Sequence, residues 1–131
     1  MPFSLSPQSL REAESSLAVS FPDSYKISMQ QDNGGEIEFE GEIWFFHPIR
    51  DLSDRKRTSR TANHVELETM KAKEWDGFPS HAISIAGDDC GNRLVFLRTE
   101  SNPVILEDAV FRWDHETCKL EVLAKTFEGL K

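Results

Sequence analysis

IAGDDCGNRLVFL, residues 85–97, places two adjacent acids, Asp88 and Asp89, in a short polar segment between two apolar runs. Gly87 and Gly91 stand where the chain has to bend. Branched and aromatic residues favour strands, whereas Gly, Asp and Asn favour tight turns. The segment therefore predicts a strand over 82–86, a turn, and a second strand over 93–98.

Two helices are predicted before this segment. Ser6 is a preferred N-cap residue and Pro7 suits the first helical position, so a helix is expected to begin at residue 7. Pro22 begins a second helix in the same way. The Asn-Gly-Gly run at 33–35 is expected to end it, because Asn and Gly tolerate the left-handed cap conformation.

EIEFEGEIWFF, residues 36–46, predicts a β-hairpin. Ile37 and Phe39 alternate with acids, so one face of the first strand is expected to be buried and the other to be acidic. Gly41-Glu42 predicts the tight turn. Residues 43–46 are expected to form the more buried partner strand.

The rest of the chain predicts one more helix and several short strands. The helix is expected over about 64–74, after a mobile stretch that begins at residue 53. Strands are expected at 104–106 and 110–113, 120–124 is compatible with strand or helix, and 126–130 predicts a short terminal helix. Short connections favour antiparallel pairing. The fold class is therefore α+β: a mixed, largely antiparallel sheet with helices packed alongside, in a single domain over 1–131.

The charge of the chain bears on its partners. It has 15 basic and 23 acidic residues, a net charge of −8. An acidic chain repels nucleic acid but attracts a basic protein. The sequence has neither a signal-peptide pattern nor an apolar run of the roughly 18 residues that a membrane helix needs. We therefore expect a cytoplasmic protein that binds neither nucleic acid nor membrane.

The acids are concentrated in residues 32–42, which contain no base. They are Asp32, Glu36, Glu38, Glu40 and Glu42. Glu36 to Glu42 and the nearby Trp44 form a candidate partner-binding face, with Asp88 and Asp89 as a second choice. The same acids are typical of an edge strand that charge keeps soluble, so both interpretations stay open. Segment 50–60 is basic and is interpreted as solvated surface, without an assigned role.

Metal chemistry is a further alternative at the ends of the predicted strands. Carboxylates and imidazoles bind divalent cations, and strand ends at one sheet edge lie together. The spacing of the candidates matches no metal-binding motif, however. The candidates are His81, Asp88, Asp89, Asp114 and His115. A metal-dependent hydrolase therefore remains a minor hypothesis.

Nucleophilic catalysis and phosphate binding have less support. Cys90 and Cys118 lack the sequence surroundings of a known catalytic cysteine, although His115 lies three residues from Cys118. The glycines at 34–35 and 87–91 match no phosphate-binding loop. We therefore expect no catalytic residue, no metal ligand and no cofactor.

Four segments together resemble one known family. They are FPDSYKISMQQDNGG at 21–35, IAGDDCGNRLVFL at 85–97, VFRWDHET at 110–117 and LAKTFEGLK at 123–131. Their order and spacing are similar to those of the SUKH superfamily in its Smi/Knr-like branch. The residues that match its motifs, as fold-defining or binding positions, are Pro22, Tyr25, Asn33, Gly34, Gly35, Gly87, Asp88, Gly91, Asn92, Trp113, Asp114 and His115.

The resemblance implies a function in protein binding. Many bacterial members are immunity proteins that bind and neutralise a secreted toxin, often a nuclease, and fungal members regulate cell-wall synthesis and signalling. The family has no established catalytic residues. The resemblance thus implies an immunity protein for a cognate protein toxin, with a regulatory module for an endogenous protein partner as the alternative. Segment 50–69 departs from the family because it is more basic and polar than expected.

Overall fold

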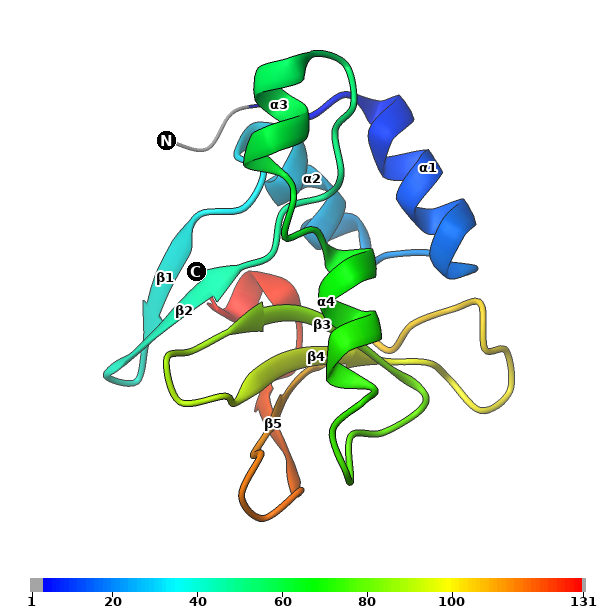
Figure 1. Cartoon of the computed structure of the whole chain (residues 1–131). Helices are drawn as coiled ribbons and strands as arrows, with labels where there is room; N and C mark the ends of the chain where they lie inside the picture. Colours follow the sequence, from blue (N-terminus) through cyan, green and yellow to red (C-terminus); the bar gives the residue numbers. More distant parts are fainter. Residues whose placement is uncertain (1–3, 131) are drawn as a thin grey trace.

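The computed structural model describes residues 4–130 and is drawn in Figure 1. No helix within these residues is long and apolar enough to cross a membrane. In chain order the elements are α1 (Pro7–Leu17), α2 (Asp23–Gln31), β1 (Glu36–Phe39), β2 (Glu42–Phe46), α3 (Arg55–Arg60), α4 (Val65–Ala72), β3 (Ala82–Gly87), β4 (Arg93–Leu97), β5 (Val110–Trp113), β6 (Leu120–Ala124) and the 3₁₀ helix η1 (Phe127–Leu130).

The strands form one six-stranded sheet in the order β1-β2-β3-β4-β5-β6. Every neighbouring pair is antiparallel, which confirms the predicted α+β fold with a largely antiparallel sheet. The predicted strand at 104–106 is wrong. This segment forms only isolated bridges, Ser20–Ile105 parallel and Arg98–Leu106 antiparallel, because a turn bond from Ile105 N–H to the Asn102 carbonyl keeps it bent.

Each face of the sheet has its own apolar cluster. On the first face, Leu10 of α1, Tyr25 and Met29 of α2, and Phe127 of η1 pack on strand residues such as Phe96. We call it the main-core face. On the second, the α4 face, Ala72 and Phe78 pack on strand residues such as Trp113. In Figure 1, α4 lies across β3 and β4, while the β1–β2 hairpin extends beside it.

The helix starts follow from local chemistry. Ser6 Oγ accepts a hydrogen bond from Ser9 N–H at 3.3 Å, and Pro7 occupies the first turn, so the predicted start of α1 is confirmed. α2 begins at Asp23, one residue after the predicted start at Pro22, which is its N-cap residue. α2 ends at Gln31, close to the Asn-Gly-Gly run as predicted, but the predicted left-handed cap is wrong, because Asp32 follows the helix in an extended conformation and Asn33 does not cap it.

Asn33 has a different structural role. It is buried, its Nδ2 donates to the Ile49 carbonyl at 2.9 Å, and its Oδ1 accepts from Ile49 N–H at 2.8 Å. These two bonds fasten the α2–β1 loop to the segment after β2. Gly34 and Gly35 have positive φ angles of 98° and 88°, which glycine adopts without strain.

The polar middle of the chain contains a helix that sequence reasoning missed. Asp54 caps α3 by accepting from Arg57 N–H at 2.7 Å, and Arg57 also pairs with Asp51 at 3.3 Å. No α3 side chain is buried, so apolar spacing could not reveal it. The later helix was predicted correctly in type: α4 begins after His64, whose Nδ1 accepts from Leu67 N–H.

Candidate protein-binding site

The β1–β2 hairpin begins the candidate site. Phe39 pairs with Glu42, so the turn residues are Glu40 and Gly41, whose φ angles are 51° and 83°. Positive φ at both positions is typical of a type I′ turn, which matches the twist of the strands. The predicted turn at Gly41-Glu42 is therefore wrong by one residue. The difference changes the cross-strand partner of each residue by two positions, so it alters the pairs but not the face on which a residue lies.

The exposed side of the hairpin combines acids with apolar groups. Glu36 pairs with Phe45 and Glu38 with Ile43, and cross-strand partners of this kind lie about 5 Å apart. Phe45 is 44% exposed and Ile43 is 50% exposed. These four residues, Glu36, Glu38, Ile43 and Phe45, are called the hairpin face below. A surface on which acids lie beside accessible apolar groups is suited to contact with a basic protein.

Three residues of the predicted partner surface do not belong to this face. Trp44 is fully buried on the main-core face, so its predicted place on a partner surface is wrong. Glu42 lies on the same side as Trp44 and forms an ion pair with Arg112 of β5 at 3.6 Å. Glu40 lies in the turn. The acids of residues 36–42 therefore do not share one face. Glu36 and Glu38 point to the hairpin face, Glu42 points to the opposite face, and Glu40 lies in the turn.

The β3–β4 turn is held together by Asp88. Its Oδ1 accepts from the backbone N–H groups of Cys90 and Asn92, both at 2.9 Å, and its Oδ2 accepts from Asn92 Nδ2 at 3.0 Å. Asp89 is exposed. Of the two adjacent acids, Asp88 thus supports the turn, whereas Asp89 presents its carboxylate at the surface.

Asn92 connects this turn to the next hairpin. Its Oδ1 accepts from His115 N–H at 3.1 Å and lies 2.9 Å from His115 Nδ1. Gly91 has a φ of 94°, and a Cβ there would lie 3.3 Å from the His115 ring. Asp114 accepts from Glu116 and Thr117 N–H groups, and these bonds lower the pKa of its carboxyl. These motif residues therefore shape two adjoining turns.

The alternative metal site is not assembled. His81 precedes β3 and Asp88 follows it, so the two lie at opposite ends of one strand. Among residues 4–130 there is no group of three or more potential metal-ligating side chains. The Cys118 thiol contacts the Asp76 carbonyl at 3.4 Å, whereas the His115 ring contacts Asn92 and Trp75. Asp88 and His115 thus meet only through Asn92, and the Cys118 thiol and the His115 ring have different partners.

A groove of about 340 Å³ lies beside the hairpin face. Its lining includes Phe45, His47, Glu68, Gly87 and Arg93. Arg93 pairs with Glu68 at 3.6 Å and donates to Ser84 Oγ at 3.1 Å, and His47 Nε2 lies 3.0 Å from the same hydroxyl. Burial, with a smaller contribution from the charge of Arg93, lowers the pKa of His47 to about 3. Its imidazole is therefore neutral at physiological pH.

His47 should make folding stability depend on pH. Because its pKa is about 3 in the folded chain and near the ordinary 6.5 in the unfolded chain, the unfolded chain binds the proton first as the pH falls. The contribution of His47 to the free energy of unfolding is therefore fully present above about pH 6.5, and it decreases as the pH falls toward 3. Each pKa unit corresponds to about 1.4 kcal/mol, so between pH 7.5 and pH 5 it contributes a loss of about 2 kcal/mol.

Urea unfolding at pH 7.5 and pH 5 tests this prediction. His47→Gln keeps a hydrogen-bonding group near Ser84 but does not titrate, so its unfolding free energy should change less with pH than that of the wild type. His81→Gln, at an exposed position, is the matched control and should retain the wild-type dependence. The same pH dependence in both variants would contradict the assignment to His47.

Sequence reasoning missed Ile43, Phe45 and the groove. The run IWFF is apolar throughout, so its composition does not say which alternate residues are buried. The available signal was the alternation of β1: once Ile37 faces inward, the pairing Ile37–Trp44 turns Phe45 outward. The predicted turn at Gly41-Glu42 would have paired Phe39 with Trp44 and would also have left Phe45 outward, so the signal did not depend on the exact turn position.

The model of the SMI1 / KNR4 family (SUKH-1) matches residues 4–130, nearly the whole chain. A search of curated proteins gives no match.

Proposed function

The chain belongs to the SMI1 / KNR4 family (SUKH-1), and we propose that it is a non-catalytic immunity protein that neutralises a cognate protein toxin by binding it. The family comprises immunity and regulatory domains that act through protein binding. A nuclease-type toxin needs a basic surface to hold nucleic acid, and an acidic protein can cover that surface. Binding alone then blocks the toxin without any chemical step.

The hairpin face is the observation that carries this proposal. On the edge strand β1, Glu36 and Glu38 lie directly beside the exposed Phe45 and Ile43 of β2, and Asp89 lies in the turn after β3. The net charge of −8 adds a field that attracts a basic partner and accelerates its encounter. The apolar groups beside these acids then provide short-range contact after the charges have guided association.

Reversing the charge of the hairpin face is expected to slow association. The double variant Glu36→Lys/Glu38→Lys should reduce the association rate constant with the cognate toxin domain by at least about tenfold at low salt. It should also weaken the salt dependence of that rate. Biolayer interferometry at several salt concentrations, together with an assay of toxin activity, measures both effects.

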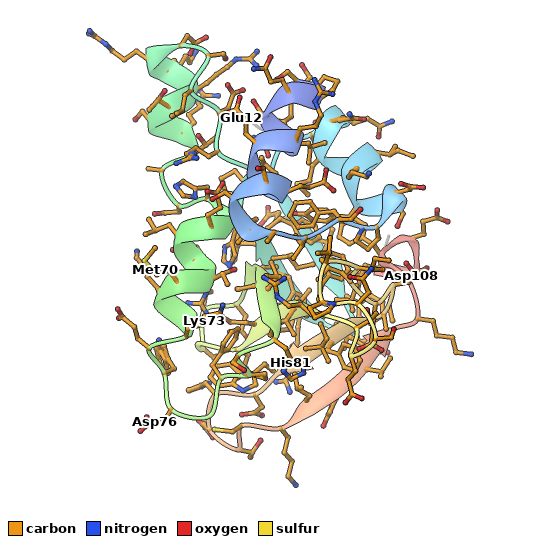
Figure 2. All side chains as sticks on the ribbon, turned by 90° about the vertical axis from the view of Figure 1, so that its right-hand side faces the viewer. Glu12, Met70, Lys73, Asp76, His81 and Asp108 are labelled. Carbon is orange, nitrogen blue, oxygen red and sulfur yellow. The ribbon has the colours of Figure 1, made fainter. Side chains whose placement is uncertain are left out.

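The matched control makes the same change in net charge elsewhere. Glu12 on α1 and Asp108 before β5 are exposed and are labelled in Figure 2, which views the molecule from the side away from the hairpin. Glu12→Lys/Asp108→Lys should slow association much less. Equal slowing in both variants would assign the effect to net charge and not to the hairpin face. If the wild-type protein does not bind the toxin but binds an endogenous protein, the proposed function changes from immunity to regulation.

A further inference from the structure

A row of paired residues crosses the α4 face. Glu36 pairs with Phe45, Phe45 with Gly87, and Gly87 with Arg93. Paired residues share a face of the sheet, so these four positions form one line perpendicular to the strands. Adjacent strands lie about 4.8 Å apart, which separates Phe45 from Arg93 by roughly 10 Å. Gly87 has no side chain, so the line has a gap at its position, and the groove described above occupies that gap.

Neither backbone conformation nor steric crowding requires glycine at this position. Gly87 does not have a positive φ, and a Cβ built on it would only reach ordinary contact, 3.7 Å from both Asn92 O and His47 Cε1. Gly91 differs, since its φ is 94° and its Cβ would lie 3.3 Å from His115. The fold would thus accommodate a side chain at 87, and glycine there leaves a space large enough for a side chain from another molecule.

The walls of this space define what fits it. Phe45 provides an accessible apolar wall. On the opposite side the charge of Arg93 is matched by Glu68, and His47 is uncharged at physiological pH. Arg60 and Asn63 also line the groove. Asp88 lines it too, so two acidic and two basic residues balance in the walls and the interior favours an uncharged side chain. The neighbouring Glu36 and Glu38 favour positive charge next to it.

We propose that the gap over Gly87 receives one large apolar side chain from a basic segment of a partner protein. The apolar group packs against Phe45, and flanking Arg or Lys side chains reach Glu36 and Glu38. A cation beside the exposed Phe45 ring gains further attraction. Binding energy at protein interfaces concentrates where one large side chain fills a pocket. This inference rests on the proposed function, because it names the chemistry of the partner at the same face.

Peptide binding followed by NMR tests the inference without the toxin. The probe is the peptide RRWRR with blocked ends, titrated to millimolar concentration into the ¹⁵N-labelled chain. Saturable shifts are expected at the amides of Glu36, Phe45 and Gly87. The control peptides RRSRR, which lacks the apolar group, and EEWEE, which reverses the charge, should bind at least about tenfold more weakly.

Variants of the chain separate the gap from the surrounding charge. Gly87→Leu fills the space and should weaken binding of RRWRR about tenfold or more, while Phe45→Ala removes the apolar wall and should act in the same direction. Val122→Ala removes an exposed apolar residue from β6, at the other edge of the sheet, and should leave binding unchanged. Thermal unfolding and the NMR spectrum of each free variant establish that its fold is kept. Phe45→Ala carries the test if Gly87→Leu fails to fold.

The outcomes distinguish this inference from the proposed function. Absence of shifts at Phe45 and Gly87, or equal binding of RRWRR and RRSRR, would overturn the inference. Neutralisation of the toxin by Gly87→Leu and Phe45→Ala at wild-type affinity would also overturn it, while leaving the immunity function intact. Conversely, binding of RRWRR in the gap by a chain that does not bind the toxin would support the inference and reject the toxin as partner.

Discussion

Replacing Trp44 with alanine is expected to lower the free energy of unfolding by about 3 to 5 kcal/mol. Trp44 is fully buried on the main-core face, among the largest side chains of the apolar cluster. Removing the indole ring breaks many close contacts and leaves a cavity, because the surrounding sheet and helices relax into the space only partly. Urea unfolding monitored by far-UV circular dichroism measures the loss. Trp44→Phe, which keeps an aromatic ring, should lose less and provides a folded variant if alanine abolishes folding.

The neighbouring Phe45 is the matched control for this prediction. It belongs to the same strand and is also aromatic, but its side chain points to the hairpin face and is 44% exposed. Phe45→Ala should change the unfolding free energy by less than about 1 kcal/mol. Equal losses for Trp44→Ala and Phe45→Ala, or a stable Trp44→Ala, would contradict the register that separates the two residues.

Replacing Asp88 with alanine is expected to cost about 2 to 3 kcal/mol of stability. The substitution removes three hydrogen bonds to a carboxylate and leaves the Cys90 and Asn92 N–H groups without that acceptor. The amides of Cys90 and Asn92 should therefore exchange hydrogen faster. Urea unfolding and amide hydrogen exchange measure the two effects. The loss should be the same with and without EDTA, because the carboxylate bonds to backbone and amide groups.

Asp89→Ala changes the net charge by the same amount at the adjacent position. Asp89 is exposed, so its substitution should alter stability by no more than about 0.5 kcal/mol. The pair of variants therefore separates the hydrogen bonds of the turn from the effect of charge. A loss of stability that depends on EDTA would support a metal-binding role for these acids. Equal losses of stability for Asp88→Ala and Asp89→Ala would support a purely electrostatic role.

Local residue chemistry predicted the elements that depend on near neighbours. Ser6 and Pro7 marked the start of α1, because capping involves only residues within one turn. The segment at 85–97 was predicted as a strand, a turn and a strand, because Gly, Asp and Asn between two apolar runs favour a tight turn. The missed helix α3 has no buried side chain, so the apolar spacing on which helix prediction relies is absent there.

The candidate site was only partly predictable, for a different reason. The acids at 36 and 38 alternate with apolar residues, so their outward direction follows from the period of a strand. For β2 the apolar run by itself allows either face to be buried, and the choice follows only from its pairing with β1, which turns Trp44 inward whether the turn lies at 40–41 or at 41–42. The gap at Gly87 depends on which residues of β2 and β4 are paired with it, and such pairing joins distant parts of the chain.

The sequence by itself determined the fold class, the starts of α1 and α2, the acidity of the β1–β2 hairpin and the resemblance to the family. Only the tertiary structure decided that Trp44 is buried while Phe45 is exposed, and that Asp88 supports a turn while Asp89 faces the solvent. The physical reason is the range of the interactions. Capping, turn formation and strand alternation act over a few residues, whereas the burial of a side chain is decided by elements far away in the chain that cover it.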